Sequence, residues 1–262
     1  MNKTTISHLA KFKAQGEKFT VVAAYDATTA LILERAGIDA ILIGDSLGMT
    51  IQGHNSTVPV SVADICYHTE AVARANKTSL IIGDMPFMSY GTTEQALQTA
   101  TAIMQAGANI VKLEGGRWLT DTVRKLNDCG VPVCCHLGLT PQSVNKLGGY
   151  RVQGRDSEAA QTILEDALAL EAAGADLMVL ECVPSELAKR ITDSLRIPVI
   201  GIGAGADTNG QVLVMQDMLG MTLKAPKFSK NFLNDAPSIE AAFTAFVEEV
   251  KSGIFPSEEH GF

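Results

Sequence analysis

The chain has 262 residues, of which 46% are hydrophobic and 19% are charged, and this length suits one α/β barrel better than two average domains. No unbroken apolar run approaches the roughly 20 residues of a membrane span, so we expect no membrane partner. With 21 basic and 29 acidic residues the formal net charge is -8, and no cluster of Lys and Arg is visible, which argues against nucleic acid as a partner.

The cysteines and the N-terminal stretch indicate no special chemistry. Five cysteines show no metal-ligand spacing such as C-x-x-C, and we interpret the vicinal Cys134 and Cys135 as small buried hydrophobic residues. Residues 1–9 contain neither an apolar signal core nor a small-residue cleavage site. The expected location is therefore the cytoplasm.

Strand-like and helix-like segments alternate along the chain. An amphipathic helix is predicted first, over residues 5–15, where it would plug or flank a barrel. Strands are predicted at 19–26, within 38–49, and at 79–87, 109–116, 131–138, 176–183, 197–205 and 211–215. Helices are predicted at 27–36, 62–75, 93–107, 120–127, 157–174 and 238–253. This wound α/β plan without a linker predicts one domain over 1–262, a single (β/α)8 TIM barrel with an N-terminal helix.

Two polar loops interrupt the alternation of strands and helices. The first covers residues 48–59, at the carboxyl end of a strand, and is suited to close over a substrate. The second covers residues 139–156 and is rich in glycine and polar residues. We expect it to be a second lid or a contact between subunits.

Acidic residues follow several of the predicted strands. Asp45, with Ser46 beside it, follows the second strand, Asp84 the third, Glu114 the fourth and Glu181 the sixth. A single acid after a strand is more often a helix N-cap or a turn residue. Repetition favours a site instead, because the carboxyl ends of the strands of a TIM barrel converge on one rim.

Two basic side chains belong to the same predicted rim. Lys112 shares a strand face with Glu114 because side chains alternate along a strand, and His136 ends the fifth strand. Lys112 either neutralises a substrate carboxylate or enolate oxygen, or only offsets the charge of the acids. His136 either has a role in the site or is a satisfied structural histidine.

Carboxylates gathered at one rim repel one another unless a cation lies among them. Oxygen ligands with room for water favour Mg2+ or another hard divalent ion, with Asp45 and Asp84 as ligands and Glu114 as a third ligand or an ion-pair partner. Zn2+ is disfavoured because its usual donors are missing. A divalent ion chelated by a 2-oxo acid would acidify the neighbouring C–H and hold the enolate, and Glu181 is the candidate base.

Glycines follow the seventh predicted strand. Gly201, Gly203 and Gly205 resemble a phosphate-binding loop, but the fingerprint of a first βα unit does not accompany them. We interpret them as sites of close backbone packing or of ligand contact at the rim.

Several segments together resemble one known family. They are Ala24-Tyr-Asp26, Gly44-Asp-Ser-Leu-Gly-Met49, Val111-Lys-Leu-Glu-Gly-Gly116, His136-Leu-Gly-Leu-Thr-Pro-Gln142, Leu180-Glu-Cys-Val-Pro184, Gly201-Ile-Gly-Ala-Gly205 and Pro226-Lys-Phe228. Over nearly its whole length the chain resembles the 3-methyl-2-oxobutanoate hydroxymethyltransferases, also called ketopantoate hydroxymethyltransferases. The segments that begin at Gly44 and His136 are the most specific.

The resemblance implies an enzyme of pantothenate biosynthesis. It would transfer a hydroxymethyl group from 5,10-methylenetetrahydrofolate to 3-methyl-2-oxobutanoate through a Mg2+-stabilised enolate, giving 2-dehydropantoate. The resemblance implies that Asp45 and Asp84 bind Mg2+, with Glu114 contributing directly or through water, and that Glu181 removes the C3 proton. The residues expected at the oxo acid are Asp45, Ser46, Asp84, Lys112 and His136. A homo-oligomer, typically a decamer, is also implied.

Some positions depart from the pattern of the family. Cys135 precedes His136 where a small residue such as glycine is common, Asn209 replaces a common aspartate, and the segment 223–226 differs. These departures leave the folate contacts open. A lyase or mutase of the phosphoenolpyruvate-mutase type is an alternative, although its K-x-C-G-H loop is missing from the sequence. A non-enzymatic barrel would leave the rim acids without a role.

Overall fold

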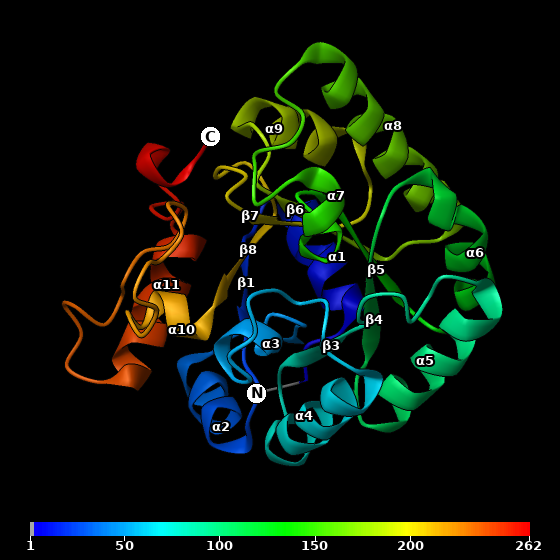
Figure 1. The fold of residues 1–262 in the computed structure, drawn as a ribbon. Helices are drawn as coiled ribbons and strands as arrows, with labels where there is room; N and C mark the ends of the chain where they lie inside the picture. Colours follow the sequence, from blue (N-terminus) through cyan, green and yellow to red (C-terminus); the bar gives the residue numbers. More distant parts are fainter. Residues whose placement is uncertain (1–2) are drawn as a thin grey trace.

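The computed structural model describes residues 3–262 and contains a closed barrel of eight parallel strands (Figure 1). The strands are β1 (Phe19–Ala23), β2 (Ala40–Ile43), β3 (Leu80–Asp84), β4 (Ile110–Glu114), β5 (Val133–Gly138), β6 (Leu177–Glu181), β7 (Val199–Ile202) and β8 (Gly210–Val214). Each strand pairs with the next in the sequence, and β8 pairs with β1 to close the ring. The predicted (β/α)8 fold is confirmed.

Most of the helices surround the strands on the outside of the barrel, and the first helix lies across one end of it (Figure 1). The longer ones are α1 (Ile6–Gln15), α2 (Ala27–Ala36), α4 (Val62–Ala75), α5 (Thr93–Gln105), α6 (Thr120–Asp128), α8 (Ser157–Ala173), α9 (Ser185–Ser194) and α11 (Ile239–Lys251). Short turns of helix are α3 (Leu47–Thr50), α7 (Val144–Leu147) and α10 (Met215–Met218), with 3-10 turns η1 (Arg117–Leu119), η2 (Pro141–Ser143) and η3 (Glu258–His260). No helix within residues 3–262 is long and apolar enough to cross a membrane.

Helix α9 was not expected from the sequence, which predicted only a connection between the sixth and seventh strands. Its buried side chains Leu187, Ala188 and Ile191 lie at helical spacing. Charged residues fill most of the remaining positions and make the apolar stripe narrow. The stripe is nevertheless sufficient to pack α9 against the barrel.

The predicted strands were generally too long at their ends. The first ends at Ala23 rather than at Asp26, because the Asp26 carboxylate accepts a hydrogen bond from the backbone N–H of Thr29 at 2.9 Å and caps α2. Asp26 is therefore a capping residue at the start of a helix.

The glycines after β7 permit close packing of the chain. A Cβ atom on Gly201 would lie 2.6 Å from Oγ1 of Thr208, in the connection between β7 and β8. Gly203 has φ +59°, and a Cβ there would lie 2.9 Å from Cδ1 of Phe228. These contacts support the interpretation of close backbone packing.

All five cysteines lie within the described residues and none forms a disulfide. Cys134 and Cys135 are fully buried in β5, and burial raises the pKa of the Cys134 thiol to about 12. Their interpretation as buried small residues is confirmed.

Helix α1 closes the amino-terminal end of the barrel. Just before the helix, the Thr4 backbone N–H donates to the carbonyl of Thr78, which precedes β3, at 2.6 Å. At its other end Lys13 Nζ donates to the carbonyl of Ile197, which precedes β7, at 2.8 Å. Because β3 and β7 lie on opposite sides of the ring, α1 crosses this opening, and Leu9 is fully buried beneath it.

The plug makes a prediction for stability. Leu9→Ala is expected to lower the free energy of unfolding by about 2–5 kcal/mol, because it leaves a cavity at a fully buried position. Lys11→Ala, on the exposed face of the same helix, is the control and should change it by less than about 0.5 kcal/mol. Urea unfolding followed by circular dichroism measures both, and equal effects would contradict the plugging role of α1.

Candidate active site

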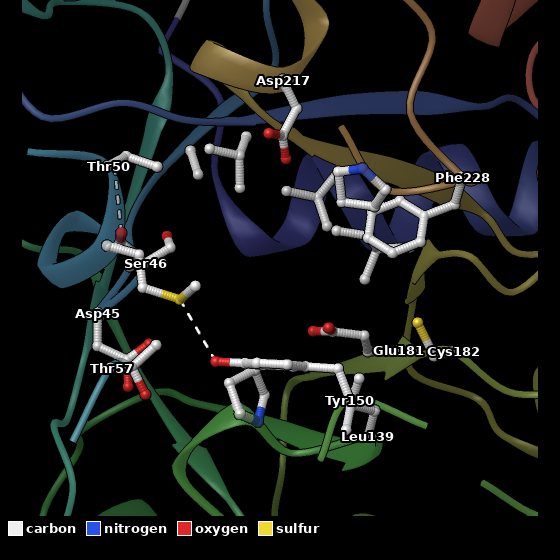
Figure 2. Close-up of a pocket in the computed structure, with 18 of the residues that line it drawn as sticks. Asp45, Ser46, Thr50, Thr57, Leu139, Tyr150, Glu181, Cys182, Asp217 and Phe228 are labelled. Atoms are coloured by element: carbon white, nitrogen blue, oxygen red, sulfur yellow. Dashed lines mark hydrogen bonds between the residues drawn. The ribbon is translucent and has the colours of Figure 1, made fainter. Parts of the chain in front are cut away.

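Charged side chains at the carboxyl ends of β3 to β6 face the inside of the barrel. Asp84 of β3 pairs with Lys112 of β4. Glu114, two residues further along β4, pairs with His136 of β5, and Glu181 ends β6. Paired residues of neighbouring parallel strands point to the same face. All of these side chains line one cavity of about 1060 Å3 at the carboxyl rim. Figure 2 shows this cavity, with the carboxyl group of Glu181 directed into it.

Asp45 and Ser46 lie just beyond β2, in the turn that leads into α3. Asp45 is only 3% exposed, and its backbone N–H donates to Oδ2 of Asp84 at 3.1 Å. Ser46 precedes α3 without capping it through its side chain, and its Oγ lies 2.8 Å from the Tyr25 hydroxyl. The helix-cap alternative for Asp45 therefore does not hold, and all seven predicted site residues line the same cavity.

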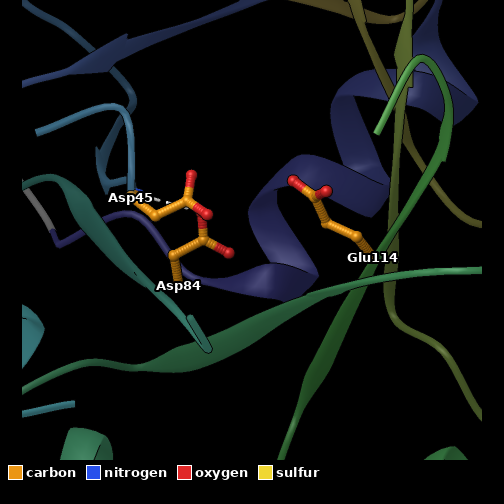
Figure 3. Close-up of side chains that lie close together, drawn as sticks. All are labelled: Asp45, Asp84 and Glu114. Atoms are coloured by element: carbon orange, nitrogen blue, oxygen red, sulfur yellow. Dashed lines mark hydrogen bonds between the residues drawn. The ribbon is translucent and has the colours of Figure 1, made fainter. Parts of the chain in front are cut away.

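Three carboxylates gather at this rim (Figure 3). Asp45, Asp84 and Glu114 each offer one oxygen atom, and these atoms lie within 4.8 Å of one another. All three residues are buried. They are the three residues predicted as metal ligands, and a set of carboxylate oxygens is the donor type that hard divalent cations prefer.

Lys112 and His136 partly neutralise these acids. Lys112 Nζ lies 2.8 Å from Oδ1 of Asp84 and 3.3 Å from Oε1 of Glu114. His136 Nδ1 lies 3.2 Å from the same Glu114 oxygen, and its Nε2 lies 3.4 Å from Oε2 of Glu181. Burial alone would lower the pKa of His136, but the charge of Glu114 and the hydrogen bonds with Glu114 and Glu181 together outweigh burial and raise this pKa to about 9. The pKa of Lys112 is also raised, because the charges of Asp84 and Glu114 outweigh its burial. The neighbouring acids therefore favour the cationic form of both side chains.

The pKa of Glu114 shows which acid is most firmly ionised. Burial by itself would raise this pKa, but Lys112 and His136 outweigh it and lower the pKa to about 2. Asp45 behaves in the opposite way. Burial, together with the charges of Asp84 and Glu114, raises the pKa of Asp45 well above its usual value.

The charges of the rim do not balance. Among the described residues, the four carboxyl groups of Asp45, Asp84, Glu114 and Glu181 face two basic side chains, Lys112 and His136. The raised pKa of Asp45 is a consequence of this excess of acids in a buried place, and a bound cation would relieve it. The donor set and the excess of acids both fit a hard divalent metal ion.

Gln142 is a residue of this site that sequence reasoning missed. Its amide Nε2 donates to Oδ2 of Asp45 at 2.9 Å and to the carbonyl of Met85 at 2.9 Å. Its backbone N–H donates to Oε2 of Glu114 at 3.1 Å, and its Oε1 accepts a hydrogen bond from the Tyr90 hydroxyl. Gln142 thus fixes one oxygen of each of two candidate metal ligands. Its place in the segment that begins at His136 was the only signal in the sequence.

The two predicted loops meet over the cavity. Residues Met49 and Thr50, from the first loop, line it together with Tyr150 and Arg151 from the second. The Tyr150 hydroxyl donates to Sδ of Met49 at 3.4 Å, a contact that Figure 2 shows as a dashed line at the edge of the cavity. Whether either loop moves on ligand binding stays a prediction.

The remaining walls of the cavity come from two other groups of residues. Apolar side chains line it on the side of β1, β2 and β6 to β8: Ala23, Leu42, Val179, Ile202, Val212 and Val214. The segment between Gln216 and Phe228 forms an outer wall that the sequence analysis did not assign to the site. It includes 223–226, one of the places where the sequence departs from the pattern it otherwise resembles.

Solved structures with the same fold include other enzymes. A phosphonopyruvate hydrolase superposes with a TM-score of 0.64 at 15% identity, covering 83% of this chain and 84% of that one. A 2,3-dimethylmalate lyase, a member of the PEP mutase/isocitrate lyase superfamily, superposes with a TM-score of 0.58 at 17% identity, covering 80% of both. At such low identity these likenesses show the fold alone.

Sequence relatives are much more similar. Residues 3–258 match the family described as Ketopantoate hydroxymethyltransferase. Two curated relatives named 3-methyl-2-oxobutanoate hydroxymethyltransferase, from Shewanella loihica and Shewanella sediminis, are 60% and 59% identical over the full length of both chains. The resemblance inferred from the motifs is confirmed, and the chain belongs to the ketopantoate hydroxymethyltransferase family of enzymes.

Proposed function

We propose that this enzyme transfers the one-carbon unit of 5,10-methylenetetrahydrofolate to C3 of 3-methyl-2-oxobutanoate, giving 2-dehydropantoate. Membership of the family supports ketopantoate hydroxymethyl transfer, a step of pantothenate biosynthesis. One observation carries the mechanism. Three buried carboxylates that fit a divalent cation share a cavity with a fourth carboxylate, Glu181, which lies apart from them.

Asp45, Asp84 and Glu114 would hold the cation, for which we propose Mg2+ because all three donors are carboxylate oxygens. When bound, the ion would polarise the 2-oxo group of the substrate and make the neighbouring C3–H more acidic. Gln142 holds Asp45 and Glu114 in place through hydrogen bonds to their carboxylates. The ligands are therefore oriented before the ion arrives.

The oxo acid would lie between the charged and the apolar walls. Lys112 would neutralise its carboxylate or the developing enolate oxygen, and Ser46 would donate a hydrogen bond from a hydroxyl that Tyr25 orients. His136 stays in the predicted contact set, and its cationic ring lies between Glu114 and Glu181. The branched aliphatic tail suits the apolar wall near Ile202.

Glu181 is the proposed general base. Its side chain is 14% exposed, and Oε2 lies 3.4 Å from Nε2 of His136, which limits the orientations of the carboxylate. Glu181 would take the C3 proton, and the electron pair left on C3 would form the new bond to the methylene carbon of the donor. Two bonds from that carbon to nitrogen would break, one when C3 attacks and the other when water adds its oxygen to give the hydroxyl group. The C3 proton and one proton of the water would replace these bonds on the two nitrogens of the departing tetrahydrofolate.

The lyase and mutase alternative shares the barrel but is less well supported. Its catalytic K-x-C-G-H loop does not occur in this sequence. The solved barrels of that type support the fold and not the chemistry. The homo-oligomer that the resemblance implies, typically a decamer, stays a prediction.

Replacing the base should separate binding from proton removal. Glu181→Gln is expected to retain binding of Mg2+ and the oxo acid but to slow exchange of the C3 proton with solvent at least about 100-fold. Exchange is followed by NMR in D2O without any folate. Glu186→Gln, an exposed glutamate on α9, is the control and should exchange at the normal rate. If Glu181→Gln exchanges the C3 proton at the wild-type rate, Glu181 is not the base.

Removing a ligand should abolish metal-dependent binding. Asp84→Ala is expected to lose Mg2+-dependent binding of 3-methyl-2-oxobutanoate, because the buried carboxylate pair of Asp45 and Asp84 is broken. Calorimetric titration with and without EDTA measures the loss, and Asp121→Ala on the surface is the control. Unchanged binding in Asp84→Ala would contradict its role as a ligand.

The hydrogen bonds of Gln142 should tune the affinity for the metal. Gln142→Ala is expected to weaken Mg2+ binding about 10–100-fold, because Asp45 loses the amide donor that orients its carboxylate. Since the backbone N–H of Gln142 survives the substitution, the larger part of the effect should arise at Asp45. Titration of Mg2+ in the presence of the oxo acid measures the affinity, with the exposed Gln161→Ala as control. Equal affinities in the two variants would show that Gln142 does not orient the ligands.

A further inference from the structure

The cavity is larger than the oxo acid requires. Its volume of about 1060 Å3 lies at the upper end of the range for sites that enclose drug-sized ligands, whereas the oxo acid has only five carbon atoms. The charged rim and the apolar floor account for the inner part. The outer part is lined by α10, by the segment that follows it, and by the loop that contains Tyr150. This outer part has room for a second, larger ligand.

Asp217 of α10 lies on the outer wall without a cationic partner. Asp217 is only 8% exposed, and one of its carboxylate oxygens, Oδ1, accepts a hydrogen bond from the Thr222 hydroxyl at 2.6 Å. Among the described residues no Lys, Arg or His side chain forms an ion pair with it, and burial raises the pKa of its carboxyl. Figure 2 shows the carboxyl group directed into the cavity. A buried acid in this situation lacks donors that a ligand could supply.

The neighbouring residue Gln216 is also among those that line the cavity. It is 6% exposed, and its buried Oε1 has no hydrogen-bond partner among the residues that the structure describes. That atom is inaccessible, so Asp217 is the acceptor that this wall presents to the cavity. A buried acceptor directed into a cavity favours a ligand that brings N–H donors.

The surrounding side chains indicate the shape and charge of that ligand. The aromatic rings of Tyr150 and Phe228 line the cavity on different sides, as Figure 2 shows, and such rings favour a flat partner. Arg151 and Lys224 also line the cavity and are exposed, at its solvent side. The outer site therefore combines acceptors at a buried end, aromatic walls and positive charge at the open end.

We propose that Asp217 recognises the pterin ring of the folate donor. The 2-amino group and N3–H of a pterin are two parallel donors, which match the two oxygens of one carboxylate, as a guanidinium group does. Tyr150 and Phe228 would flank the planar ring system, and Arg151 and Lys224 would attract the glutamate carboxylates of the tail. The inference rests on the proposed function, since it assigns residues to the donor named there.

The oxo acid is a poor candidate for this outer site. It is an anion without N–H donors, and the charge of Asp217 would repel it. A purely structural role for Asp217 is the other possibility, because its hydrogen bond with Thr222 connects α10 to the following segment. The two roles predict different responses to a ligand that lacks the 2-amino group.

The experiment uses the full-length enzyme and tetrahydrofolate as the probe. Asp217→Asn keeps the size of the side chain and the contact with Thr222 but replaces one acceptor by a donor. Titration calorimetry is expected to show binding of tetrahydrofolate weakened about 10–100-fold, the range for loss of hydrogen bonds to a charged group. Asp235→Asn, which removes an exposed charge outside the cavity, is the matched control and should bind normally.

A second ligand separates recognition from structure. The 2-desamino analogue of tetrahydrofolate should bind wild-type protein about 10–100-fold more weakly than tetrahydrofolate does. If Asp217 contacts the 2-amino group, Asp217→Asn should bind both ligands with similar affinity. Loss of affinity for both ligands by the same factor would show a structural role and overturn the proposal.

Proton exchange in the oxo acid distinguishes this inference from the proposed function. This exchange needs no folate, so the rate at which Asp217→Asn catalyses it should lie within about twofold of the wild-type rate. The KM of the same variant for 5,10-methylenetetrahydrofolate should rise. Normal exchange with an unchanged KM would overturn the role of Asp217 alone. Wild-type protein that neither exchanges the proton nor binds tetrahydrofolate would overturn the proposed function and this inference together.

Discussion

The concentration of negative charge at the carboxyl rim is the constraint on which the rest of the site depends. Asp45, Asp84 and Glu114 bring carboxylate oxygens within 4.8 Å of one another in a buried place. Such an arrangement is tolerated only with cations and hydrogen-bond donors around it. Lys112 and His136 supply part of that compensation, and Gln142 supplies neutral donors. The remaining imbalance gives this site its capacity for a divalent cation.

The inward-facing side chains at the rim are charged on one side of the barrel and apolar on the other, because alternate residues of each strand face the interior. At the level of the cavity, the lining side chains include Asp84, Lys112 and His136 on β3 to β5, and Ile202 and Val214 on β7 and β8. A ligand at this level therefore meets charge on one side and apolar side chains on the other. A small acid with a branched aliphatic tail also has one charged end and one apolar end. The strands alone therefore provide a matching surface for each end of the proposed substrate.

The sequence predicted most of the inner site because strand periodicity decides it. A short apolar run that ends in an acid places that acid at the rim, as happens at four of the eight strands, and the closed ring of strands leaves little freedom in the arrangement. The same reasoning could not find Gln142 or Asp217, since both lie outside strands and their positions depend on how loops fold back. The same reasoning also missed α9, because its few apolar residues alternate with charged ones and give only a weak helical pattern in the sequence. Asp26 was placed at the end of a strand because a helix N-cap and a strand-end acid look alike in sequence.

The two parts of the cavity place different demands on their acids. In the inner part, Glu114 has a lowered pKa because Lys112 and His136 lie beside it, which favours its ionised form. Asp217, in the outer part, has no such partner within residues 3–262, where its carboxylate accepts a hydrogen bond from the Thr222 hydroxyl. An acid of the first kind suits a place beside a cation, whereas one of the second kind gains its missing donors only when a ligand is present. Because a cationic partner would occupy the carboxylate in the free enzyme, its absence makes Asp217 available to a ligand that brings its own N–H groups.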